Sequence, residues 1–117
     1  MAEREKLYRK FQESGQEKLR LEIALQEFSG EAAEGYQTEQ KAYGDYIRRR
    51  IRPAVELLMD RGDLEKIEKL AGYGWITEKQ LEEFIQKALR QDNRAVLFYL
   101  LHLKNRTTGF HDREFLL

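Results

Sequence analysis

The feature that most restricts the fold of this sequence is an internal similarity between two segments that lie thirty positions apart, 55–63 and 85–93. Each is followed by a further apolar segment. The matching apolar pairs are Val55 and Ile85, Leu58 and Ala88, Met59 and Leu89, Ile67 and Leu97, and Leu70 and Leu100. Apolar residues at helical spacing, repeated at such a period, indicate a helix-turn-helix unit that occurs twice. The pattern predicts a stack of antiparallel helix pairs.

The composition favours helix over strand along the whole chain. The sequence has one proline in 117 residues, many Glu, Lys, Arg, Leu and Gln residues, and no segment with the alternation of a half-buried strand. We therefore predict an all-α fold of about five helices, in which a compact stack of antiparallel pairs is joined by an extra N-terminal helix.

The N-terminal part of the chain is expected to be separate from the rest. Apolar residues from Leu7 to Phe28 follow heptad spacing, which is interrupted near Gly15. Residues 29–35 contain two glycines among small and acidic residues, which is typical of a linker. The predicted division is an N-terminal helical segment and linker at 1–35 and a helical core domain with a C-terminal tail at 36–117. Whether the N-terminal helix packs on the core stays open.

Turn residues set several expected boundaries in the core domain. A helix is expected from about Tyr36 to Asp60, and Pro53 either kinks it or begins a new helix. Gly62 should end this helix, and Asp63 should cap the next one.

The clearest predicted boundary is a capping box formed by Thr77 and Gln80. The side chain of each residue is expected to accept the backbone N–H of the other, and the helix that follows is expected over 78–91. The following segment, 95–103, is apolar on all sides and is expected to lie at the centre of the fold. Residues 107–117 are expected to form a turn-like tail.

The segment 61–70 and its counterpart at 93–101 resemble the second-helix portion of ankyrin-type repeats, and the resemblance extends over residues 55–104. It implies a short stack of paired antiparallel helices and no binding residue. The period differs from the family's period of about 33 residues, and the Thr-Pro-Leu-His motif is absent. Residues 99–105 also resemble the terminal helices of uncharacterised small bacterial proteins, which implies no function.

Charge and residue types exclude several classes of function. Lys and Arg total 21, as do Asp and Glu, so no net charge attracts the chain to nucleic acid or to an anionic membrane. There is no cysteine, which excludes disulfides and thiolate metal sites. His102 and His111 have no ligand spacing, and neither a nucleophile with a partner histidine nor a carboxylate pair is evident. We expect no metal, no cofactor and no enzymatic activity.

The expected location is the cytoplasm. The first residues lack the apolar core of a signal peptide, and no apolar run approaches the roughly 20 residues of a membrane span. No association with a membrane is expected.

The densest charge cluster is the basic segment, which comprises Arg48, Arg49, Arg50 and Arg52. On a continuous helix Arg48 and Arg52 share a face, so the guanidinium groups could bind phosphates or an acidic partner. The alternative is a solvated face paired with nearby acidic residues, and the neutral net charge favours it.

A second candidate surface is the aromatic turn, Tyr73 to Trp75. Tryptophan and tyrosine are enriched where proteins bind one another, so Trp75 could anchor a partner. It could equally seal the core beside Ile76 and Leu81, because Ile76 precedes the capping box as a hydrophobic staple does.

The function predicted from these patterns is a small, non-enzymatic protein–protein interaction or regulatory module that uses the basic segment and the aromatic turn. One alternative is a nucleic-acid-binding accessory protein that uses the basic segment. Another is a structural homodimer that forms through the N-terminal helix.

Overall fold

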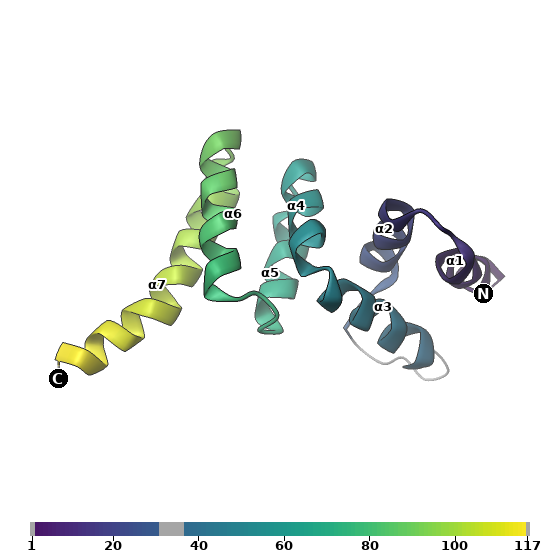
Figure 1. Cartoon of the computed structure of the whole chain (residues 1–117), viewed down its shortest axis with the longest axis horizontal. Helices are drawn as coiled ribbons and strands as arrows, with labels where there is room; N and C mark the ends of the chain where they lie inside the picture. Colours follow the sequence, from purple (N-terminus) through teal and green to yellow (C-terminus); the bar gives the residue numbers. More distant parts are fainter. Residues whose placement is uncertain (1, 31–36, 117) are drawn as a thin grey trace. The chain divides into compact units, whose positions relative to one another are not determined.

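The structure, a computed structural model, describes residues 2–30 and 37–116, and its regular secondary structure is α-helical there (Figure 1). The helices are α1 (Ala2–Glu13), α2 (Glu17–Glu27), α3 (Gln37–Arg49), α4 (Ile51–Arg61), α5 (Leu64–Gly72), α6 (Glu78–Gln91) and α7 (Arg94–Leu116). The predicted all-α class is confirmed. The expected number of about five is wrong, since these described residues form seven helices.

Contacts between residues divide the chain into two compact units, Met1–Ala54 and Val55–Leu117. The domain boundary predicted between residues 35 and 36 lies outside the described residues. Helix α2, which precedes this boundary, packs against α3, which follows it, in the first unit. Helix α1 packs against α2.

The first unit begins with the interruption that the sequence predicts near Gly15. Helix α1 ends at Glu13, and α2 begins at Glu17 after the Gln16 N–H donates to the Ser14 hydroxyl at 3.1 Å. The N-terminal segment therefore forms two helices instead of one. Its main apolar residues are buried: Phe11, Leu21, Ile23, Ala24 and Leu25.

The long helix expected over residues 36–60 is also two helices. Helix α3 ends at Arg49, α4 begins at Ile51, and Pro53 is the third residue of α4. A proline in the first helical turn removes no intrahelical hydrogen bond, because that turn has no acceptor for its N–H. The structure thus agrees with the interpretation in which a new helix begins at Pro53, with its start two residues earlier.

Polar and steric contacts join the end of α2 to α3. The Gln40 side chain accepts the Ser29 N–H at 2.8 Å and donates to the Glu27 carbonyl at 2.8 Å, so it satisfies backbone groups where α2 ends. Gly44 on α3 is buried, and a Cβ there would lie 2.9 Å from the Phe28 ring. Glycine therefore permits the close approach of Phe28.

Tyr43 belongs to an aromatic cluster in the first unit. It is 2% exposed, and its ring makes edge contacts with Phe11 and Tyr8 at centroid distances of 4.9 and 5.7 Å. Burial, followed by the charges of Glu27 and Glu39 and by Tyr8, raises the pKa of Tyr43 to about 12. Burial disfavours the charged phenolate.

This raised pKa predicts a loss of stability at alkaline pH. Because the folded protein holds the Tyr43 proton above the ordinary pKa, the contribution is complete below about pH 10 and is lost as the pH rises to about 12, a change of ~2–3 kcal/mol. Urea unfolding between about pH 9 and pH 12 measures it. Tyr43→Phe should remove this part of the pH dependence, and equal pH dependence in both proteins would contradict the prediction.

Two turns in the second unit have the same backbone geometry. Gly62 after α4 and Asp92 after α6 are both left-handed, with φ of 67° and 53°. The next residue in each turn donates its N–H to the carbonyl five positions earlier, as in a Schellman motif. These bonds join Asp63 to Leu58 at 2.9 Å and Asn93 to Ala88 at 3.2 Å.

The same turns also begin the following helices in the same way. Asp63 and Asn93 each accept, through Oδ1, the backbone N–H three residues later, at 3.2 and 3.3 Å. The capping box of Thr77 and Gln80 is present, with bonds of 3.2 and 3.0 Å, and α6 has its predicted bounds. The chain thus forms an α4–α5 hairpin and an α6–α7 hairpin with equivalent turns (Figure 1). The ankyrin-type resemblance stays a prediction.

The placement of α7 at the centre of the fold is wrong. Val96 and Leu100 are buried, but Phe98 is 66% exposed and Leu101 is 38% exposed. Successive residues lie about 100° apart around a helix, so Phe98 is on the side opposite Val96 and Leu100. Over the residues of α7 whose side chains are described, one side of the helix is covered and the opposite side is exposed. The turn-like tail is also wrong, because α7 continues to Leu116.

Candidate functional site

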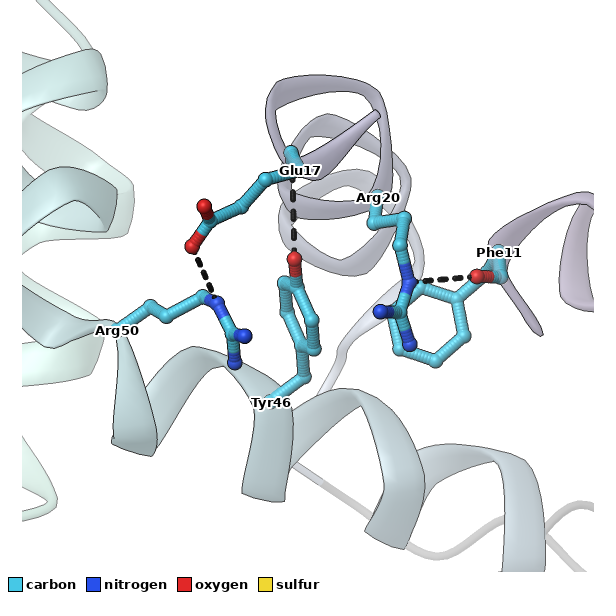
Figure 2. A network of polar contacts seen from close by, with 5 residues as sticks. All are labelled: Phe11, Glu17, Arg20, Tyr46 and Arg50. Atoms are coloured by element: carbon cyan, nitrogen blue, oxygen red, sulfur yellow. Dashed lines mark hydrogen bonds and ion pairs between the residues drawn. The ribbon is translucent and has the colours of Figure 1, made fainter. Parts of the chain in front are cut away.

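The first candidate surface, at the basic segment, is partly occupied by contacts within the first unit (Figure 2). The Arg20 Nε donates to the Phe11 carbonyl at 2.8 Å, and its guanidinium lies 4.7 Å from the Tyr46 ring centroid. The Tyr46 hydroxyl donates to the Glu17 carbonyl at 3.3 Å. These contacts hold α1, α2 and α3 together through cation–π and hydrogen-bond interactions.

Arg50 belongs to this network. Its Nε forms an ion pair with the Glu17 carboxylate, and its guanidinium lies 4.1 Å from the Tyr46 ring centroid, on α3 (Figure 2). The geometry thus gives Arg50 a structural contact with α2. The sequence contains no signal for this pairing, because Glu17 and Arg50 are far apart along the chain.

The other three arginines of the basic segment are exposed. Arg48 and Arg49 lie in the last turn of α3, where positive charge interacts favourably with the helix dipole. Arg52 lies in the first turn of α4. Because the helix is interrupted at Arg50, the continuous face assumed for Arg48 and Arg52 does not exist.

The aromatic turn lies in the second unit, between α5 and α6. Tyr73 is 41% exposed, Trp75 is half-buried, and their rings are 4.8 Å apart between centroids at an angle of 32°. Gly74 has a φ of 77°, which lets the chain turn between them. Tyr73 is therefore open to solvent in part, and Trp75 is covered on part of its surface.

The sequence reasoning missed a third surface, the α6–α7 apolar face, which consists of Leu89, Phe98 and Leu101. All three are exposed, Leu89 to 54%. The apolar character of their segments predicts burial instead. The thirty-residue comparison contains a signal for Phe98, since its counterpart in the α4–α5 hairpin is Glu68, a residue typical of a solvent-facing position.

An ion pair indicates which residues of α7 lie beside Leu89. Lys104 on α7 pairs with Glu82 on α6. Residues seven apart lie on the same side of a helix. Leu89 follows Glu82 by seven residues on α6, and Leu97 precedes Lys104 by seven residues on α7, which runs in the opposite direction. Leu89 therefore lies next to Leu97. Leu101 is one turn from Leu97 on α7, and Phe98 is one turn from Leu101, so these residues are neighbours on the helix surface.

A polar hollow of about 740 Å³ lies between the two equivalent turns of the second unit. Asp60 forms one wall, where it accepts from the Gln91 amide at 2.7 Å and pairs with Lys87 at 3.3 Å. The hollow is open to solvent. Its lining residues are Met59, Asp60, Arg61, Gly62, Gln91, Asp92, Asn93 and Arg94.

Within the described side chains, no three His, Asp or Glu residues come together as metal ligands would. His102 is exposed on α7, and the side chain of His111 lies outside the described part. None of the helices among the described residues is long and apolar enough to cross a bilayer.

Comparisons of the chain with protein-family models, with curated proteins and with solved structures found no match. The described chain is an all-α protein with two helical units.

Proposed function

We propose that this chain is a non-enzymatic protein–protein interaction module that binds its partner through the α6–α7 apolar face. The observation that carries the proposal is the exposure of Phe98, which lies with Leu89 and Leu101 on adjoining parts of two helices. Contiguous exposed apolar residues on a water-soluble surface are typical of binding sites. Aromatic residues with large exposed area contribute strongly to such sites.

The alternative functions have less support from the geometry. For nucleic-acid binding, Arg50 already contacts Glu17, and Arg48 and Arg49 occupy the favourable end of a helix dipole. For a homodimer through the N-terminal helix, Phe11 and the apolar residues of α2 are buried in their own unit. Few apolar residues of the heptad pattern at 7–28 therefore remain exposed to contact a second copy of the chain.

Affinity capture with quantitative mass spectrometry tests the proposal. Phe98→Asp should remove a specific partner that the wild-type chain captures, because a charge would be placed in the apolar contact, whereas the double variant Arg48→Glu, Arg49→Glu should retain it. The reverse result would assign function to the basic segment. A ligand that is nucleic acid, with affinity falling steeply as salt increases, would support the nucleic-acid alternative.

A further inference from the structure

In the α4–α5 hairpin, one side of α4 is covered by the α6–α7 hairpin. Met59 on α4 is 2% exposed, and Lys87 of α6 pairs with Asp60 at 3.3 Å and Glu56 at 3.6 Å. The α6–α7 hairpin therefore packs on the side of α4 that carries Met59 and its acidic neighbours.

The electrostatic environment of Tyr99 agrees with this arrangement. Burial, and secondly the Glu68 carboxylate, raise the pKa of Tyr99 on α7. Glu68 itself is exposed, so it lies at the edge of the contact between the two hairpins. Ala71 lies on the same side, because residues three apart are neighbours on a helix surface.

The equivalent side of the α6–α7 hairpin is open. Thirty residues on, buried Met59 corresponds to Leu89, which is 54% exposed. Glu68 and Ala71 correspond to Phe98 and Leu101. Leu89 thus occupies a position that a helix covers in the preceding hairpin, whereas Phe98 and Leu101 occupy positions at the edge of that contact, where Glu68 is exposed and Ala71 is half-buried.

The charge on this side is reversed. Asp60, which pairs with Lys87, corresponds to Arg90 on α6, which is exposed. Arg94, also exposed, lies one turn before Phe98 on α7. A helix that packs on α6 as α6 packs on α4 would place the residue equivalent to Lys87 near Arg90. A basic residue there would be repelled, and an acidic one would be attracted.

We propose, building on the proposed function, that the α6–α7 apolar face binds an amphipathic helix of a partner protein, with an acidic residue at the position that Lys87 has in α6. The apolar side of this helix covers Leu89, Phe98 and Leu101, and its carboxylate pairs with Arg90. A second copy of this chain in the same arrangement is disfavoured, because its own Lys87 would meet Arg90. The partner is therefore a different, acidic helix.

Peptides made from α6 itself test this proposal. The probes are labelled peptides of residues 77–92, unmodified, with Lys87→Glu, or with Lys79→Glu, and their binding to the full chain is measured by fluorescence anisotropy. The Lys79→Glu peptide has the same net charge as the Lys87→Glu peptide, but its acidic residue lies elsewhere on the helix. It therefore controls for general electrostatic attraction.

The Lys87→Glu peptide should bind the wild-type chain roughly two- to fivefold more tightly than either other peptide, the range expected for one partly exposed ion pair. The chain with Arg90→Glu should prefer the unmodified peptide, and Phe98→Asp should weaken the binding of all three. Both variants should keep the helix content of the wild type in circular dichroism, because the substituted positions are exposed.

Equal affinity for the Lys87→Glu and Lys79→Glu peptides, or no reversal with Arg90→Glu, would overturn the acidic-helix inference. If binding still depends on Phe98, the proposed function stands. Absence of peptide binding also overturns the inference. So does Phe98-dependent binding to phosphatidylserine-containing vesicles without peptide binding, which would assign the face to a membrane surface.

Discussion

Phe84→Ala should lower the free energy of unfolding by about 3–5 kcal/mol, the range for removing a buried aromatic side chain. Phe84 on α6 is almost fully buried and is among the largest fully buried side chains of the described chain. The substitution removes apolar contacts and leaves a cavity that close-packed neighbours fill only in part. Urea or thermal unfolding monitored by circular dichroism measures the loss.

Phe98→Ala is the matched control for this substitution. The same atoms are removed, but from a side chain that is 66% exposed, so the free energy of unfolding should change by only about 0.5 kcal/mol. Similar losses in the two variants would mean that Phe98 is buried in the folded protein. The α6–α7 apolar face would then not exist as described.

Leu100→Ala on α7 should lower the free energy of unfolding by about 2–5 kcal/mol. Leu100 is fully buried, whereas the next residue, Leu101, is 38% exposed. Leu101→Ala should therefore cost less than about 1 kcal/mol. Because the two leucines are adjacent in the same helix, helix propensity changes equally in both variants, and the difference between them measures burial alone.

An equal, large loss in both variants would restore the original expectation of a helix buried on all sides. An unchanged unfolding midpoint for Leu100→Ala would contradict the packing of α7 on the rest of its unit. Either result would be visible in the same unfolding experiment.

Local signals predicted the helix boundaries of the second unit well. Gly62, Asp63 and the capping box of Thr77 and Gln80 act within a few residues of themselves, so their hydrogen bonds form wherever the chain is helical on either side. The helix break near Gly15 also depends only on residues next to it in the sequence.

The helix count failed where two outcomes had the same local pattern. Pro53 is compatible with a kink and with a new helix, and nothing within one turn of it distinguishes them. The interrupted heptad pattern of the N-terminal segment is likewise compatible with one weakened helix and with two helices.

The candidate sites depend on contacts between residues that are far apart in the sequence. Arg50 appeared as part of a basic cluster, and only the packing of α2 against α3 brings Glu17 to it. The exposure of Phe98 likewise depends on what covers the second hairpin, which periodicity within α7 does not contain.

The sequence by itself determined the all-α class, the capped turns of the second unit and their thirty-residue correspondence, because helix propensity and capping act over one or two turns. Only the tertiary structure decided which apolar residues are buried. An apolar side chain is buried only if a neighbouring element covers it, and the side of α7 that carries Phe98 is left exposed. That difference turns an expected core residue into a candidate binding site.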